Sequence, residues 1–444
     1  MNNNLNLKRE SSMAAVFSKE YDHNMTIEEL KETLNESDEF IIIEFEESQK
    51  HIVEKSIWEV SLKLQYLPMV MESDTDKEKD IEETKNNDEL TFYIALIEAS
   101  SITENLPEVF SVNTVHESDY IEATKCKYAI HISTIFNNFP LTDYQRQLKL
   151  LNNVAADVSI FLDISCFTAR SGEWLKYTST FSLPPSLSYL YTIHAIYDDD
   201  KNPDKIEYWF HTHGLYRVGC IELEIIGVED SNAAYGQLLN TCAKLFIQNG
   251  VPESGFVFSP SYKVKVCWLA WEEALKELNI DKDFSGGFKD RNDGVHDNPS
   301  GALVAVDENG NYHTLDYYKK ELTDNPVFLL SSFETEIMRE AAFEKIEYFL
   351  ELLNKNKGDD KISFLVKLAY NDNKSNKDLE HLWFEVHDFT KEGYFDATLL
   401  NEPYKDLGIH EGDRGIHSME NLTDWQIYTD ERIYNSGNIY LLFS

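Results

Sequence analysis

The sequence predicts a multi-domain α+β protein with mixed and antiparallel sheets, packed helices and a small β-rich module at its C-terminal end. The chain has 444 residues, which is too long for one ordinary hydrophobic core. Its hydrophobic fraction of 42% and aromatic fraction of 13% are ample for packed interiors. Strand-like and helix-like segments follow one another without the strict alternation of a parallel doubly wound sheet, which favours the α+β class.

The first part of the chain divides into a polar arm over residues 1–22 and an α+β region over residues 23–185. Thr26 and Glu29 have the spacing of a helix-capping box, so a helix is expected to begin there. Residues 40–45 are short and β-branched, which predicts a buried strand. Residues 72–88 are acidic and almost free of apolar side chains, which predicts a solvated loop.

A central α+β region is predicted over residues 186–330. Strands over residues 189–197 and 205–211 are expected to form a hairpin. A helix over residues 231–248 is expected to end at an Asn-Gly pair. The glycine-, aspartate- and asparagine-rich segment over residues 281–301 is expected to be a long loop, and its His296 suggests either a catalytic lid or disorder.

The C-terminal module is expected to span residues 331–444 and to begin with the most regular helical pattern of the chain. Apolar residues recur at three-to-four spacing over residues 333–353, which predicts this helix. Alternating or β-branched segments then predict four strands, over residues 362–370, 381–388, 394–400 and 439–443.

Several motifs in the last part of the chain resemble a bacterial domain of unknown function, family 2314. They are Glu380-His381-Leu382-Trp383, Asn401-Glu402-Pro403, Gly412-Asp413 and Asp424-Trp425. The preceding three hundred residues resemble the uncharacterised family 4026, through the segments over residues 209–215 and 221–224. The resemblance implies a bacterial cytosolic protein and brings no activity with it.

The charge of the chain is strongly one-sided. It carries 79 acidic and 40 basic side chains, a formal net charge of −39. Such a surface repels phosphate backbones and anionic lipids, so nucleic acid and membranes are not expected as partners. The acidity either serves solubility or faces a basic protein partner.

The cysteines and the start of the chain predict a cytoplasmic protein. The five cysteines are an odd number, widely spaced among apolar neighbours, as buried reduced thiols would be. The first residues lack a signal-peptide core, and no apolar run is long enough to span a membrane.

His211 and His213 are the best candidate metal ligands. Two histidines at i and i+2 on a strand project to one side, as in many zinc sites, and Glu222 or Glu224 could add a carboxylate. The competing interpretation, which we prefer from sequence alone, is that both rings brace a turn at Gly214 by bonding backbone carbonyls.

A second set of candidate residues lies in the C-terminal module and suggests binding. Trp383 and Glu385 lie on one predicted strand, although a tryptophan there is more often packed than exposed. The other candidate binding residues are Asn401, Glu402 and Trp425.

Sequence alone therefore favours a non-enzymatic protein-binding role without a cofactor, for example an immunity-type protein that neutralises a basic toxin. No phosphate-binding, dinucleotide-binding, nucleophile-elbow or zinc-protease motif occurs. The alternative is a zinc-dependent hydrolase centred on His211 and His213. A scaffolding role fits equally well, and the sequence leaves the oligomeric state open.

Overall fold

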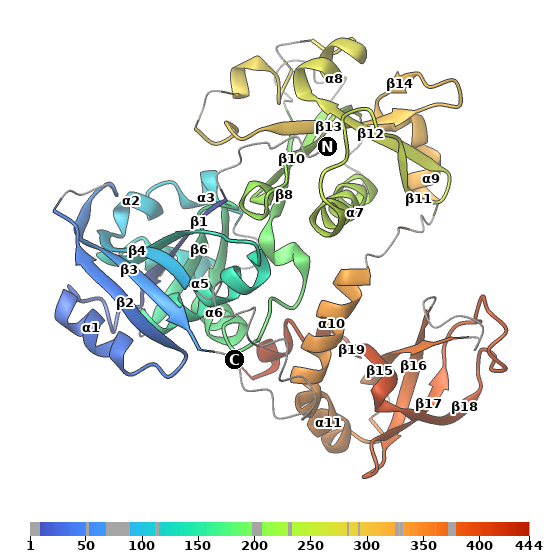
Figure 1. Ribbon diagram of the computed structural model, residues 1–444. Helices are drawn as coiled ribbons and strands as arrows, with labels where there is room; N and C mark the ends of the chain where they lie inside the picture. The colour runs from blue at the N-terminus through green and yellow to red at the C-terminus, as the bar shows by residue number, and fades with distance from the viewer. Residues whose placement is uncertain are drawn as a thin grey trace, which may run out of the picture. The chain divides into compact units, whose positions relative to one another are not determined.

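The computed structural model of the chain contains two compact units (Figure 1). The first comprises Met1–Ser179 and Ser188–Ser331, and the second comprises Thr180–Leu187 and Ser332–Ser444. The acidic segment over residues 72–88 lies outside the described residues. The structure describes residues 9–49, 53–67, 89–111, 115–155, 157–197, 207–229, 233–281, 284–291, 294–324, 328, 332–359, 361–371 and 379–443.

The first sheet of the first unit is antiparallel, with the strand order β2-β3-β4-β5-β1-β6-β7. Its strands are β1 (Glu10–Phe17), β2 (Phe40–Glu47), β3 (Ser56–Tyr66), β4 (Glu89–Glu98), β5 (Tyr128–Ile135), β6 (Val158–Asp163) and β7 (Thr168–Ser171). The accompanying helices are α1 (Ile27–Asn35), α2 (Ser100–Thr103), α3 (Leu106–Val109), α4 (Glu117–Ala123), α5 (Pro140–Val154) and α6 (Gly172–Thr178). The capping box of α1 is formed as predicted by Thr26 and Glu29.

Two predictions for this sheet are wrong. Within residues 1–22, β1 is a central strand between β5 and β6 instead of a polar arm, and residues 13–17 are buried. Both faces of β1 are covered, so its apolar residues run continuously and show no alternation. Conversely, β2 is an edge strand and not a buried one, with Ile41 52% and Ile43 42% exposed.

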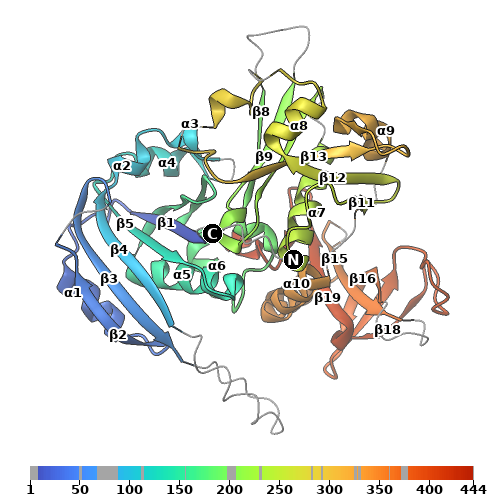
Figure 2. The ribbon, with the colours of Figure 1, turned by 45° about the horizontal axis from the view of Figure 1, so that its top comes forward.

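The second sheet of the first unit has the order β11-β12-β13-β10-β9-β8, and β14 pairs with β13. The pairing of β10 with β13 is parallel, and the other pairings in this sheet are antiparallel. The predicted hairpin is confirmed as β8 and β9, and the predicted helix as α7. The elements are β8 (Thr192–Tyr197), β9 (Tyr208–His213), β10 (Glu222–Val228), β11 (Phe258–Ser261), β12 (Val264–Ala270), β13 (Ser300–Val306), β14 (Tyr312–His313), α7 (Ala233–Asn249), α8 (Trp271–Glu277) and α9 (Lys319–Thr323). Figure 2 shows both sheets of the unit from a second direction.

A buried ion pair joins the two sheets. The turn after β9 is a short 3-10 helix, Leu215–Val218, entered through Gly214 with φ +106°. A Cβ on Gly214 would lie 2.5 Å from Cys166 Sγ, so only glycine fits this close approach. Within the turn, Arg217 is fully buried and donates to both oxygens of Asp163, at 3.0 Å each. Asp163 ends β6, so the pair fastens the second sheet to the first.

The second unit contains a sheet with the order β18-β17-β16-β15-β19-β20 and two helices against it. Its elements are α10 (Ser332–Glu344), α11 (Ile346–Lys355), β15 (Ser363–Tyr370), β16 (Glu380–Phe389), β17 (Tyr394–Leu399), β18 (Arg414–Ser418), β19 (Leu422–Tyr428) and β20 (Ile433–Asn435). The core includes Phe349 of α11, whose ring centroid lies 5.6 Å from that of Phe364 and 5.5 Å from that of Trp425.

Two predicted elements of this unit differ from the structure. The helix over residues 333–353 is interrupted at Lys345, whose Nζ donates to Thr180 Oγ1 at 2.8 Å. The predicted strand over residues 439–443 is instead a 3-10 helix, Ile439–Leu442. The chain leaves the sheet after β20 because the Asn435 N–H donates to Asn438 Oδ1, at 2.7 Å, and closes a turn.

The predicted state of the cysteines is confirmed, because all five are free and buried. Among the described helices, none combines the length and the apolar character that crossing a membrane requires.

Candidate metal centre

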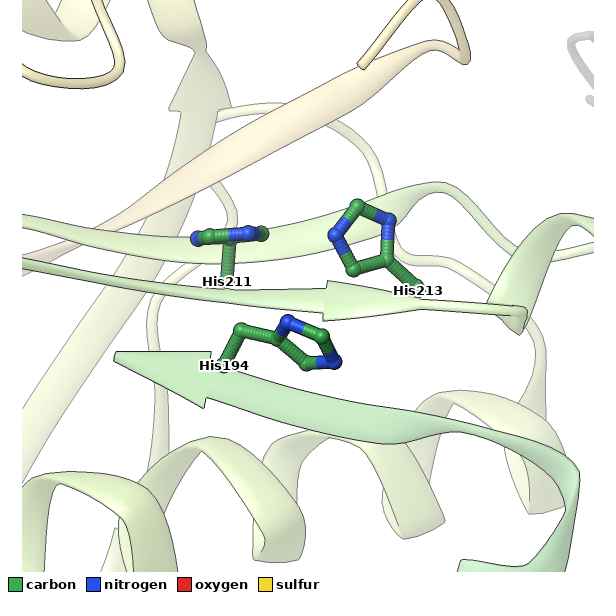
Figure 3. Close-up of side chains that lie close together, drawn as sticks. All are labelled: His194, His211 and His213. Atoms are coloured by element: carbon green, nitrogen blue, oxygen red, sulfur yellow. The ribbon is translucent and has the colours of Figure 1, made fainter. Parts of the chain in front are cut away.

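The hairpin of β8 and β9 brings three histidines together (Figure 3). The antiparallel register pairs His194 with His211 and Thr192 with His213. Directly opposed residues project to the same face of a sheet, as do residues two apart on one strand. One nitrogen of each of the three imidazoles therefore lies within 4.8 Å of the other two.

Burial favours the neutral imidazole at two members of this cluster, His194 and His211. His211 is 2% and His213 5% exposed, whereas His194 is half-buried. Loss of hydration lowers the pKa of His211 well below its usual value, and the neighbouring imidazoles lower it further. Loss of hydration also lowers the pKa of His194. Neutral imidazole is the form that coordinates a metal ion.

Two buried nitrogens of the cluster lack a hydrogen-bond partner among the described residues. They are Nδ1 of His211 and Nε2 of His194. An unpaired buried polar atom costs about 1–3 kcal/mol. Among the described residues His211 donates to no backbone carbonyl, so the interpretation that it braces a turn through carbonyls is wrong for this ring.

A fourth histidine reaches the cluster from the loop before β13. The Nε2 atoms of His296 and His211 lie 3.2 Å apart. The ring centroid of His296 is 5.1 Å from that of His213 and 4.8 Å from that of Trp209. Trp209 in turn stacks on His211, with centroids 3.9 Å apart. The predicted loop over residues 281–301 therefore places His296 next to the histidines of β9.

The two glutamates predicted to assist the histidines have other partners. Glu222 accepts from Thr212 Oγ1 at 2.6 Å and from the Gly214 N–H at 2.9 Å, and burial raises its pKa to about 7. Glu224 is bound by Arg291, with 2.6 Å from Nη1 to Oε1 and 2.7 Å from Nη2 to Oε2. Of the predicted ligand set, the structure thus gathers His211 and His213, joins His194 to them, and leaves both glutamates out of the cluster.

Sequence reasoning missed His194 as a member of this site. The signal was present in the predicted hairpin, because pairing its strands places a residue of β8 opposite His211. Identifying that residue required the register, which depends on a turn that the sequence does not specify.

In the C-terminal module, Trp425 belongs to the core and not to a binding surface. Its side chain is fully buried, and Nε1 donates to the backbone oxygen of Ala342 in α10 at 3.0 Å. This burial corrects the prediction that Trp425 is a binding residue. A tryptophan with a satisfied N–H and no exposed surface contributes to packing.

Two other predicted binding residues order the loop between β17 and β18. Asn401 accepts from the backbone N–H of Trp383 at 3.1 Å. Glu402 accepts from Nδ1 of His410 at 2.8 Å and from the N–H of Glu411 at 2.9 Å. The Asn-Glu-Pro motif therefore has a local structural role.

Trp383 and Glu385 lie half-buried on β16. The Lys367 Nζ lies over the Trp383 ring, 5.5 Å from its centroid.

Family models match most of the chain. The model described as protein of unknown function (DUF4026), N-terminal, matches residues 11–185, and the C-terminal model of the same family matches residues 193–304. A third model, uncharacterized protein conserved in bacteria (DUF2314), matches residues 336–443. No curated protein and no solved structure matches the chain. The chain therefore joins both parts of the DUF4026 family to a DUF2314 domain, as its motifs predicted.

Proposed function

We propose that the first unit binds one transition-metal ion, for which zinc is the best match, through His194, His211 and His213. The observation that carries this proposal is the convergence of the three imidazoles, whose ligand atoms lie within 4.8 Å of one another. In a tetrahedral zinc site with Zn–N bonds of about 2.0–2.1 Å, ligand nitrogens lie about 3.3–3.5 Å apart. Binding of the ion therefore requires the three ligand nitrogens to move closer together.

The type of donor determines the class of metal. Imidazole nitrogen suits Zn²⁺, Cu²⁺, Ni²⁺ and Fe²⁺, whereas Ca²⁺ and Mg²⁺ require oxygen ligands. The nearest predicted oxygen donors, Glu222 and Glu224, are held by other groups. The unpaired Nε2 of His194 supports a ligand role further, because coordination would satisfy a polar atom that is otherwise buried at a cost.

We do not extend the proposal to a hydrolase. Metal-dependent hydrolysis requires a metal-bound water together with a group that accepts its proton. The sequence offered Glu222 or Glu224 for that task. Glu224 forms a bidentate ion pair with Arg291, and Glu222 accepts hydrogen bonds from the turn after β9. Both carboxylates that were predicted to accept the proton therefore have other partners.

Zinc titration of protein prepared without a histidine tag tests the proposal. In competition with a chromophoric chelator, we expect one high-affinity zinc ion per chain. His211→Ala removes a ligand and should weaken binding by at least about 100-fold, the upper end of the range for groups that only support a ligand. The exposed His116, in the same unit, provides the matched control, and His116→Ala should bind zinc as the unaltered chain does. Equal affinity in the His211→Ala variant would contradict the proposal.

The charge of the chain favours a second function, the binding of a basic protein in a reducing compartment such as the cytoplasm. A net charge of −39 accelerates association with a positively charged partner. The five free, buried thiols support the reducing compartment. Affinity capture from bacterial lysate at low salt should enrich a basic protein, whose association rate should then fall steeply with ionic strength. A partner set without basic proteins would contradict this second proposal.

A further inference from the structure

We infer that His296 is the fourth ligand of the metal centre and that the ion pair of Glu224 with Arg291 positions it. A bound ion would then be enclosed by four histidines and closed to water. This inference rests on the proposed function, because it specifies the coordination of the same site.

His296 lies beside the three-histidine cluster, against His211. Its Nε2 lies 3.2 Å from Nε2 of His211. That separation is close to the roughly 3.3 Å expected between two nitrogens bound to one tetrahedral zinc ion. His194, His211 and His213 come from the hairpin, whereas His296 comes from the segment that precedes β13. The hairpin thus supplies three ligands and a separate segment supplies the fourth.

Arg291 fastens the segment that carries His296 at both of its ends. On one side its guanidinium donates to the backbone oxygen of Gly286, with 3.1 Å from Nε. On the other side Nη1 donates to Ser300 Oγ, at 3.0 Å. The same guanidinium forms the bidentate ion pair with Glu224 of β10. Because Gly286 and Ser300 flank His296 in the chain, the single cation of Arg291 fixes the loop to the sheet.

Aromatic packing links this ion pair to the histidines. The Arg291 guanidinium carbon lies 4.4 Å from the ring centroid of Trp271 and 5.3 Å from that of Trp209. Trp209 Nε1 donates to Glu224 Oε2 at 3.0 Å, and its ring stacks on His211. A Cβ on Gly286 would lie 2.6 Å from the Trp209 ring, and the φ of +89° also requires glycine. The loop therefore packs against Trp209, the side chain that stacks on the ligand His211.

Four protein ligands define a closed centre. Structural zinc sites have four protein ligands, whereas catalytic sites leave one position for water or substrate. With His296 bound, the ion would tie the loop before β13 to strand β9. Arg291 acts in this arrangement as a positioning residue, since it touches Glu224 and the loop and not the ligand nitrogens.

Cobalt substitution of the full chain tests the coordination. Co²⁺ at a closed four-histidine centre should give a visible spectrum that azide leaves unchanged. His296→Ala opens one position, so the variant should still bind Co²⁺ and its spectrum should shift on addition of azide. An azide response of the same size in the unaltered chain would overturn the inference. Absence of any cobalt spectrum in the unaltered chain would instead refute the proposed metal binding itself.

A double-variant comparison tests the role of Arg291. Arg291→Lys keeps the positive charge but loses the bidentate interaction with Glu224. This variant should weaken Co²⁺ binding by about 10–100-fold. If Arg291 acts through His296, then Arg291→Lys in the His296→Ala background should change the affinity by no more than about twofold. A further loss equal to that of the single variant would show that Arg291 supports the fold or the other three ligands instead.

Discussion

Replacement of Arg217 by methionine is expected to lower the free energy of unfolding of the first unit by about 3–5 kcal/mol. The reason is that Asp163, which is 1% exposed, would keep a buried charge without its partner. Arg217 also donates to the backbone oxygen of Leu190 at 2.9 Å and to Ser11 Oγ at 3.2 Å. Urea unfolding of the full chain measures the loss.

The matched control for this prediction removes both charges. In the double variant Arg217→Met with Asp163→Leu no uncompensated charge remains, and much of the stability should return. Arg217 lies in the C-terminal part of the DUF4026 family and Asp163 in its N-terminal part, so the ion pair links the two parts within one compact unit. A loss below about 1 kcal/mol in the single variant would contradict this account, because that is the range of exposed ion pairs.

Zinc is expected to stabilise the first unit by about 2.7 kcal/mol when its free concentration is 100 times the dissociation constant. The gain arises because the ion binds the folded hairpin and not the unfolded chain. His194→Ala should lose this zinc-dependent increment, and a chelator should reverse it in the unaltered chain. Denaturant unfolding with and without zinc measures the increment in each protein.

The second unit provides an internal control for the zinc effect. Its histidines, among the described residues, do not form a metal-ligand cluster with one another, so its unfolding should be independent of zinc. His387→Ala is a suitable control variant, because the His387 ring bonds Thr398 Oγ1 at 2.8 Å in that unit. Equal zinc stabilisation of the His194→Ala and His387→Ala variants would show that the ion acts elsewhere.

The sequence predicted the elements whose signal is local. The capping box of α1, the hairpin of β8 and β9, helix α7 and three strands of the C-terminal module are all in place. Strand β1 was missed because it has no alternation, and its central position depends on partners more than a hundred residues away. The 3-10 turn at Ile439–Leu442 was missed because a short apolar run does not distinguish a strand from a helical turn.

The sequence predicted two of the four histidines of the candidate site, His211 and His213, as metal ligands. His211 and His213 share one strand, so their common direction follows from the period of two. His194 joins them through the strand register, and His296 joins them through a loop whose position depends on the Arg291 ion pair. The two glutamates were chosen for their proximity along the chain. In the structure Glu224 pairs with Arg291, and Glu222 accepts from the turn after β9. The spacing of residues along the chain does not predict these partners.

An X-ray absorption spectrum at the zinc edge, recorded on the zinc-loaded full chain, tests the central claim most directly. A centre built by the histidines of β8, β9 and the loop before β13 should show about four nitrogen neighbours at about 2.0 Å, with the scattering pattern of imidazole rings and no sulfur. A shell of about six oxygens, or sulfur at about 2.3 Å, would show that these histidines do not hold the ion.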